Sequence, residues 1–281
     1  DESLSVEVDG SVYSPGDGNL TVSGNTGELV IPAANALAEG TYDITARVVD
    51  SLGNAANDPT NGELQVDLTA PITPTVTPLA SNDSTPILQG TASLAPGETL
   101  RVLLSGHSYL AGDGNLSLNG TDWSLQVPVA NEFTVDGLFD VEAIVTDEAG
   151  NVSIDLTTNE FLYDTTLPDA PTVDLLTTND PTPSIPGNAN LAGDESLTVT
   201  VNGRTYREAD PELTLAGSAW VLTIASADAL PEGTYDVDAV VTDALGNANN
   251  DTTSNELVID LTPPAVPTSD TLVSNSATPT L

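Results

Sequence analysis

The sequence predicts an all-β protein made of tandem sandwich domains, and three observations support this prediction. First, one stretch recurs three times and ends each time in Asp-x-x-Gly-Asn, at residues 42–54, 139–151 and 235–247. Second, the aspartates that open these endings are spaced by 97 and then 96 residues, a period that indicates an array of similar domains of ordinary size. Third, short apolar–polar alternations between Gly and Pro turns predict strands, and helical periodicity is almost lacking.

The recurring stretch is predicted to be a strand with one buried face. In its third copy, one face would carry Tyr235, Val237, Ala239 and Val241. Side chains two positions apart point to the same side of a strand, and the residues between these four are mostly polar. The strand then enters an acidic turn, which begins in the three copies at Asp50, Asp147 and Asp243.

The strands that precede this stretch follow one order in each copy. Leu and Val alternate with polar residues up to a Gly turn and a Tyr in the matching segments 1–13, 97–109 and 194–206. A short strand is then predicted at 20–22, 116–118 and 213–215. Alanine-rich loops at 33–39 and 225–231 are predicted to carry a single helical turn.

A tryptophan begins the next strand in two copies. Trp123 and Trp220 each start an alternating segment, which predicts a core side chain rather than a platform for a ligand. Gly27 takes this position in the first copy.

A last strand and a proline close each copy. The strand ends in Asp67, Asp164 or Asp260, and a proline follows four residues later. Proline cannot continue a central ladder, so it ends the strand and begins a stiff linker. The sequence therefore divides into a repeat lacking its first strands, two complete repeats, and the first strand of a further repeat, at 1–69, 70–166, 167–263 and 264–281. Seven strands in an immunoglobulin-like sandwich fit the length of each repeat, in a linear array.

The composition excludes several classes of function. The net charge is −38, from 42 acidic residues against four arginines, so nucleic acid and anionic membrane surfaces are not expected as partners. No apolar run is long enough to span a membrane, no signal peptide is visible, and the first residues lie inside a repeat, which suggests a fragment of a longer protein. The chain has no cysteine, which excludes disulfides and Cys-ligated zinc.

Many of the acids have a simple explanation as a solvated surface, but some recur where repeats should meet. If seven strands run alternately between two poles, the Asp-x-x-Gly-Asn turn and the loop after the second strand lie at the pole that faces the preceding linker. The junction between the first two repeats should gather Asp67, Glu98, Asp147 and Asn151. The next junction should gather Asn82, Asp83, Asp164, Asp194, Glu195, Asp243 and Asn247. Equivalent positions in the other copies are Asp1, Glu2, Asp50, Asp180 and Asp260.

Carboxylates that converge without a basic partner repel one another unless a cation lies among them. Calcium takes six to eight oxygen ligands with loose geometry, so we expect Ca²⁺ at these junctions. The alternative is that these residues only cap turns, as Asp and Asn commonly do. A second acidic motif, Asp-Gly-Asn at 17–19 and 113–115, is interpreted as a hairpin turn, since Asp-Gly favours such turns.

The repeats resemble the bacterial Ig-like repeats of large surface adhesins that type I systems secrete, including RTX-type and biofilm-associated adhesins. The resemblance is carried by the Gly-Thr-Tyr…Asp-x-x-Gly-Asn strand, the Asp-x-Thr-x-Pro linker and the Asn-Asp-x-Thr-Pro opening. It implies extender domains that project a distal binding module from the bacterial cell surface and are stiffened by Ca²⁺. Gly27 and the pair Asn275-Ser276 depart from the pattern.

Catalysis is not expected. The single histidine, His107, has no counterpart in the other copies and is predicted to be an isolated surface residue. Paired carboxylates are abundant, but aromatic sugar platforms are scarce because only 4% of residues are aromatic.

Three functions therefore stay open: a structural extender of a Ca²⁺-dependent adhesin, a carbohydrate- or host-protein-binding module, and a fibre or surface-layer subunit. Near-equivalent repeats favour the first. On this hypothesis the chain is an extracellular, monomeric rod, its partners are its own neighbouring repeats, it does not insert into membranes, and its distal ligand is unknown. The segment 276–281 could instead pair as a strand with another chain.

Overall fold

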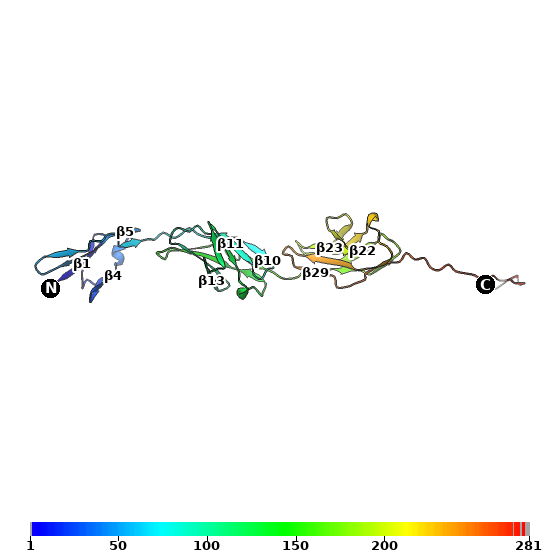
Figure 1. Ribbon diagram of the computed structural model, residues 1–281, viewed down its shortest axis with the longest axis horizontal. Coiled ribbons are helices and arrows are strands. Elements are labelled where there is room, and N and C mark those ends of the chain that lie inside the picture. The colour runs from blue at the N-terminus through cyan, green and yellow to red at the C-terminus, as the bar shows by residue number, and fades with distance from the viewer. Residues whose placement is uncertain (1, 272, 276, 279–281) are drawn as a thin grey trace. The chain divides into compact units, whose positions relative to one another are not determined.

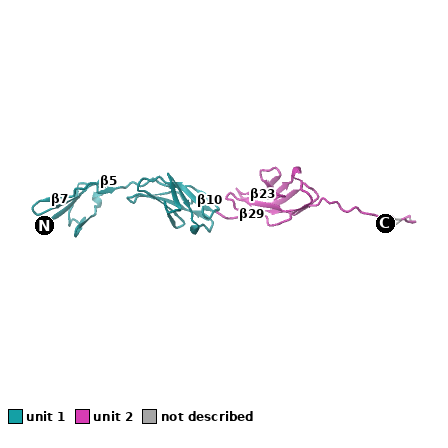
Figure 2. Ribbon diagram, viewed as in Figure 1, with its two compact units in different colours: residues 1–163 teal, residues 164–281 magenta. Residues whose placement is uncertain are grey.

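A computed structural model describes residues 2–271, 273–275 and 277–278 (Figure 1). The chain separates into two compact units, residues 1–163 and 164–281 (Figure 2). The first unit contains the first two sequence repeats and the second contains the third. No helix in the described part of the chain is long and apolar enough to cross a membrane.

The second repeat shows the complete arrangement of strands. Its strands are β9 (Thr75–Val76), β10 (Leu79–Ser81), β11 (Ile87–Thr91), β12 (Thr99–Leu104), β13 (His107–Leu110), β14 (Leu116–Asn119), β15 (Asp122–Gln126), β16 (Gly137–Phe139), β17 (Val141–Thr146), β18 (Val152–Ile154) and β19 (Phe161–Tyr163). They form sheets in the orders β14-β15-β11-β9, β13-β12-β17-β18 and β10-β19-β16. The predicted all-β class and immunoglobulin-like sandwich are therefore confirmed.

The eleven strand segments outnumber the seven that the sequence predicts, for three reasons. The segment between the Asp-x-x-Gly-Asn turn and the last strand forms an additional short strand, β18. The hairpin after Gly106 forms a strand of its own, β13. The long strands also pass from one sheet to another, so that the recurring stretch is interrupted at Asp140 between β16 and β17. The opening strand divides in the same way, and its second half, β10, runs parallel to the last strand, β19, whereas the other strand pairs are antiparallel.

The third repeat has the same topology. Its strands are β20 (Thr172–Val173), β21 (Leu176–Thr178), β22 (Ser184–Asn188), β23 (Ser196–Val201), β24 (Arg204–Arg207), β25 (Leu213–Ala216), β26 (Ala219–Thr223), β27 (Gly233–Tyr235), β28 (Val237–Thr242), β29 (Ala248–Asn250) and β30 (Leu257–Ile259). The sheet orders are β20-β22-β26-β25, β24-β23-β28-β29 and β21-β30-β27. The described residues between 261 and 278 form no strand, and residues 272, 276 and 279–281 lie outside the described chain, so a further repeat stays a prediction.

The first repeat contains β1 (Ser3–Val8), β2 (Ser11–Tyr13), β3 (Leu20–Ser23), β4 (Thr26–Leu29), β5 (Gly40–Tyr42), β6 (Ile44–Val49), β7 (Ala55–Asn57) and β8 (Leu64–Val66). One four-stranded sheet, β2-β1-β6-β7, matches the other repeats. The other two sheets, β3-β4 and β5-β8, have only two strands each, because the described residues include no counterparts of β9, β10 and β11.

Each complete repeat has its own core, built from the inward faces of these strands. In β28, the residues Val237, Ala239 and Val241 are buried, as the alternation predicts. Trp123 and Trp220 are both 1% exposed, which confirms them as core residues. The strand register places Gly27 at the tryptophan position, opposite Val22 as Trp123 is opposite Leu118. The predicted helical turns are short 3₁₀ segments, η1 (Ala33–Asn35), η2 (Val129–Asn131) and η3 (Ser226–Asp228).

Candidate functional site

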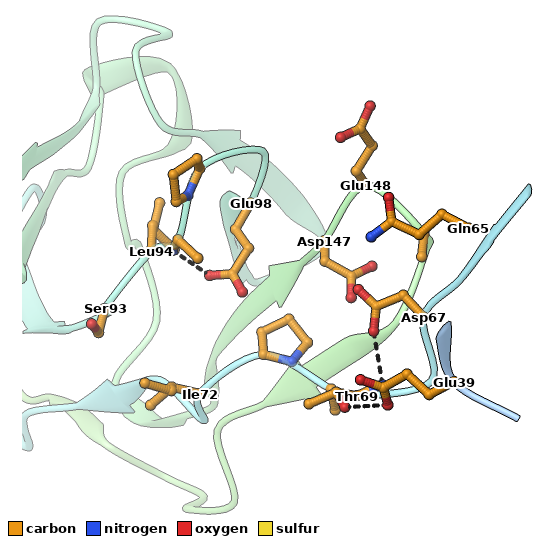
Figure 3. Close-up of a pocket in the computed structure, with 15 residues that line it drawn as sticks. Glu39, Gln65, Asp67, Thr69, Ile72, Ser93, Leu94, Glu98, Asp147 and Glu148 are labelled. Atoms are coloured by element: carbon orange, nitrogen blue, oxygen red, sulfur yellow. Dashed lines mark hydrogen bonds between the residues drawn. The ribbon is translucent and has the colours of Figure 1, made fainter. Parts of the chain in front are cut away.

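Within the first unit, the linker after β8 lies beside two loops of the second repeat. Together they line a cavity of about 780 Å³, which we call the junction cavity (Figure 3). The linker contributes residues 67 and 69–72, and the loops contribute 93–96 with 98, and 147–149. Glu39 and Gln65 of the first repeat complete the lining.

The junction cavity is acidic. Carboxylates reach it from Glu39, Asp67, Glu98, Asp147 and Glu148, and none of the described residues that line it is basic. The sequence prediction that Asp67, Glu98 and Asp147 lie at one junction therefore agrees with their position in the fold. In the described chain, however, no three acidic side chains gather closely enough to form a metal cluster. The donors suit Ca²⁺ chemically, but their carboxylates surround the cavity without converging on one point.

Asp147 is already engaged by its own turn. Its Oδ1 accepts the backbone N–H of Asn151 at 2.8 Å, and its Oδ2 accepts the Asn151 side-chain amide at 2.8 Å. These bonds favour the charged form, so the Asn151 amide is the main cause that holds the pKa of Asp147 below its usual value. Asp147 therefore caps its own turn, and its carboxylate stays ionised at the edge of the cavity.

The equivalent aspartates of the other two repeats are held in the same way. Asp50 accepts hydrogen bonds from both the backbone N–H and the side-chain amide of Asn54. The side-chain amide is the largest cause that lowers the pKa of Asp50. Asp243 is similarly bonded to Asn247. Desolvation acts to raise the pKa of Asp243, but the hydrogen bonds from Asn247 outweigh it and the pKa is lowered.

The same asparagine also fixes the linker. Asn151 Nδ2 donates to the backbone carbonyl of Asp67 at 3.0 Å, and Asn247 Nδ2 donates to that of Asp164 at 3.0 Å. A second bond lies further along each linker, from Ser153 Oγ to the Pro71 carbonyl at 2.6 Å and from Asn249 Nδ2 to the Pro168 carbonyl at 3.0 Å. We call each pair of bonds the linker clamp, and it ties each linker to the repeat that follows it.

The linker acids form local turns. Asp67, Asp164 and Asp260 each accept the backbone N–H of the threonine two residues later, at 2.9–3.0 Å. In the first repeat, that threonine, Thr69, also donates its hydroxyl to Glu39 at 2.6 Å. Thr262 and Glu232 make the same contact in the third repeat. One carboxylate oxygen of each linker aspartate therefore serves the turn.

The remaining predicted ligands cap turns or lie on the surface. Asp83 accepts a hydrogen bond from the backbone N–H of Thr85, and Asp180 accepts one from that of Thr182. Glu98 and Glu195 accept hydrogen bonds from the backbone N–H groups of Ala95 and Ala192, respectively. Asp194 is an exposed turn residue, and Glu2 is exposed just before β1. Asp1 lies outside the described residues. The expected meeting of Asp83 with Asp194, Glu195 and Asp243 would join the two units, and it stays a prediction.

Two carboxylates at the junction cavity, Glu39 and Glu148, were not among the residues that the sequence predicted. Glu39 had a usable signal, because an acid precedes the Gly of the recurring strand in every repeat, as Glu39, Asp136 and Glu232. Glu148 had none, since its counterparts are Ser51 and Ala244.

Two other sequence interpretations are confirmed by the structure. Asp17 and Asp113 are turn residues, because each accepts three backbone N–H groups from its own hairpin. His107 is exposed at the start of β13.

One family model and several solved structures are similar to this chain. A family model described as a bacterial Ig-like domain matches residues 172–261, the third repeat. Among solved structures, a 1.5-MDa bacterial ice-binding adhesin, studied for host cell surface retention, is similar with 18% identity and a TM-score of 0.42, over 92% of this chain and 87% of that chain. An I-band fragment of titin is similar with 10% identity and a TM-score of 0.38, over 92% and 88%. At these scores the structural likenesses carry no argument about function. No curated protein matches the sequence.

Proposed function

We propose that this chain is a structural spacer of a bacterial cell-surface adhesin and that Ca²⁺ binds at the junctions between its repeats. The observation that carries the proposal is the junction cavity, where five carboxylates from a linker and the adjoining loops surround one space with no basic residue in its described lining. The three near-equivalent repeats support a spacer, because a recognition site would usually make one repeat diverge.

In the first unit, the proposed ligands are Asp67, Glu98 and Asp147, with Glu39 and Glu148 beside them. A bound cation would supply positive charge that offsets the repulsion among these carboxylates. Asp67 belongs to the linker, whereas Glu98 and Asp147 belong to the second repeat, so shared coordination would restrict the linker. The linker clamp already holds the backbone of Asp67 beside Asn151. This supports the role of Asp67 as a ligand, because ordering its carboxylate around a cation would cost little further conformational entropy.

The equivalent acids of the other repeats extend the proposal along the chain. Asp164, Asp194, Glu195 and Asp243, with Asp83 before them, would form a second site of the same kind. Asp180 and Asp260 would serve a third junction, and Asp1, Glu2 and Asp50 would serve one before the first repeat.

The wider context is part of the same proposal. The chain would be an extracellular, monomeric extender of a type I-secreted, RTX-type or biofilm-associated adhesin, and it would hold a distal binding module away from the cell. Its partners would be its own neighbouring repeats, with no role in nucleic-acid binding, membrane insertion or catalysis. Four positively charged side chains against 42 acids support the exclusion of nucleic acid.

Calcium titration by calorimetry tests the site in the first unit. The double variant Asp67→Asn, Glu98→Gln keeps both hydrogen-bond acceptors but removes two charges, and it should weaken one binding event by about tenfold or more. Asp122→Asn, an exposed acid outside the cavity, is the matched control and should bind as the unaltered chain does. Equal affinity in the double variant and the control would exclude this site.

Small-angle X-ray scattering tests the spacer role separately. Addition of millimolar Ca²⁺ after EDTA should narrow the distribution of interatomic distances, because fewer linker conformations would be populated. The double variant should show a smaller change. A scattering curve that does not respond to Ca²⁺, despite binding by calorimetry, would leave the metal site intact but remove its mechanical role.

A further inference from the structure

One sheet of the second repeat carries apolar side chains on its outer face. In the sheet β13-β12-β17-β18, Leu100, Val102 and Leu104 of β12 lie in the core at 0–3% exposure. Because side chains alternate along a strand, the residues between them point to the opposite face. The apolar residues on that face, which we call the outer patch, are Leu103, Leu110, Ile144, Val152 and Ile154. The three on the edge strands β13 and β18 are 39–54% exposed.

The outer patch is specific to the second repeat. The strand register identifies the equivalent positions in the other two repeats, and these are mostly polar. The counterparts of Leu103, Ile144 and Ile154 are Glu7, Arg47 and Asn57 in the first repeat, and Thr200, Val240 and Asn250 in the third. The inward faces follow one pattern in all three repeats, so the sandwich does not require apolar residues on this outer face. An exposed apolar patch that the fold does not require indicates contact with another molecule.

Two opposite charges lie within the outer patch. Arg101 pairs across the sheet with Ile144, and Glu142 pairs with Leu103 in the next row. The four residues form a square in which Arg101 and Glu142 occupy one diagonal, at a separation of about 7–8 Å. Neither charge has an ion-pair or side-chain hydrogen-bond partner among the described residues. A molecule that pairs with both must present a carboxylate and a cation at the same separation.

A second copy of this chain presents that arrangement. If a two-fold axis runs along the other diagonal of the square, through Leu103 and Ile144, it exchanges the positions of Arg101 and Glu142. Each guanidinium then faces the partner's carboxylate, as an isologous contact requires. Leu103 and Ile144 face their own counterparts at the centre, and the apolar edge-strand residues surround the charges.

We infer that the outer patch is a contact surface between two copies of this chain. The apolar side chains supply the buried area, and the two Arg101–Glu142 pairs fix the orientation, because complementary charges favour one alignment over others. The inference adds a second copy to the proposed partners and depends neither on calcium nor on the spacer role.

The net charge sets the conditions under which the contact forms. Each copy carries a net charge of −38, so two copies repel one another in dilute solution at low ionic strength. Salt screens this long-range repulsion, whereas ion pairs that are partly buried in a contact are screened much less. The chain is therefore expected to be a monomer when dilute and to associate at high local concentration and moderate salt.

Sedimentation equilibrium of the full chain with EDTA tests the inference. At protein concentrations up to about 1 mM and in about 0.5 M NaCl, the unaltered chain should form dimers. Arg101→Glu and Glu142→Arg should each weaken association by about tenfold or more, because each places like charges against one another across the two-fold axis. An equimolar mixture of these two variants should regain the affinity of the unaltered chain, since every charge then meets its opposite. The double variant should regain it alone.

Two further variants serve as controls. Ile154→Asn introduces the residue that the other repeats carry and should weaken association, because it removes exposed apolar area. Thr198→Glu changes the counterpart of Arg101 in the third repeat and should leave association unchanged. NMR spectra check that each variant is folded. A chain that stays monomeric at the highest concentration would overturn the inference, and so would a mixture of the charge variants that associates no better than either one alone.

Discussion

At the scale of single residues, one asparagine amide links the turn to the linker. The two N–H bonds of Asn151 Nδ2 are directed to different groups, the carboxylate of Asp147 and the carbonyl of Asp67. Asn247 repeats this arrangement with Asp243 and Asp164. The first fixes an ionised acid at the turn and the second fixes the chain that enters the repeat.

Substitution of Asn151 by alanine removes both contacts, and each loss can be measured separately. In Asn151→Ala the pKa of Asp147 should rise toward the ordinary value of 3.8, as measured by NMR titration of its carboxyl carbon. A carboxyl with a lowered folded pKa stabilises the fold above its unfolded pKa, and this stabilisation is lost as pH falls through the folded value. The variant should therefore be less stable than the parent above about pH 4, and the difference should shrink in stronger acid.

Asn54→Ala is the matched control for the linker contact. It removes the same support from Asp50, while no linker carbonyl is bonded to Asn54 among the described residues. Only Asn151→Ala should increase amide exchange at residues 68–70. Equal exchange in both variants would show that the bond to Asp67 does not order the linker.

A buried glutamate gives a second test at this scale. Glu160 is 3% exposed, its Oε2 accepts the N–H of Val141 at 3.0 Å, and its Oε1 has no hydrogen-bond partner among the described residues. Glu160→Ala should lower the free energy of unfolding of the second repeat by about 1–3 kcal/mol, because it leaves a buried N–H unpaired. Glu63→Ala breaks the same bond at an exposed position, to Ile44, and should cost about 0.5 kcal/mol. Urea unfolding measures both, and equal losses would contradict the role of burial.

At the scale of elements, the opening strands are fixed by close approach to a tryptophan. Gly90 of β11 lies where any side chain would overlap both the Trp123 ring and the Thr75 carbonyl. The Trp123 indole also donates to that carbonyl at 3.0 Å, which joins β9 to β15 across β11. Strand interiors rarely favour glycine unless a neighbour comes this close.

Gly90→Ala should therefore destabilise the second repeat by about 3 kcal/mol, because the added methyl forces β9 or the indole to move. Gly27→Ala is the matched control: a strand glycine with space for a methyl, expected to change stability by no more than about 0.5 kcal/mol. Denaturant unfolding followed by Trp fluorescence reports the second repeat through Trp123, and the NMR signals of the first repeat report the Gly27→Ala control, because that repeat has no tryptophan. If Gly90→Ala left the free energy of unfolding unchanged, the contact with Trp123 would have room for a methyl group.

The sequence predicts these elements unevenly. Alternation in 235–247 indicates which face of β28 is buried, and the repeat period places Asp67, Glu98 and Asp147 at one junction. Neither signal predicts that the recurring strand changes sheets at Asp140, since alternation continues across the break. The sequence also does not indicate why a glycine is needed at position 90, because the side chain that requires it is a tryptophan more than thirty residues away. Glu148 could not be found from the period, since the other repeats lack it.

At the scale of the whole molecule, each repeat has a separate core. Leu125 belongs to the core of the second repeat and Leu222 to that of the third, and both are 0% exposed. The core of the first repeat is smaller: its buried residues are Val6, Val8, Tyr13 and Leu20, with half-buried side chains around them. Separate cores indicate separate unfolding transitions.

Scanning calorimetry should therefore resolve more than one transition, with the first repeat unfolding at the lowest temperature. Leu125→Ala should lower the midpoint temperature of the second repeat's transition alone, because it reduces the free energy of unfolding of that repeat by about 2–5 kcal/mol. Leu222→Ala is the matched variant in the third repeat. A shift of every transition by either substitution would show that the repeats unfold as one.

The linker clamp also bears on how such a chain can be lengthened or shortened by recombination. Each linker is hydrogen-bonded to the repeat that follows, and the second compact unit begins at Asp164, whose carbonyl Asn247 holds. A transferable module therefore starts at the linker aspartate and carries its own docking bonds. Chimaeras joined just before Asp67 or Asp164 should preserve those bonds, whereas chimaeras joined after Pro71 or Pro168 would pair each asparagine with a foreign linker.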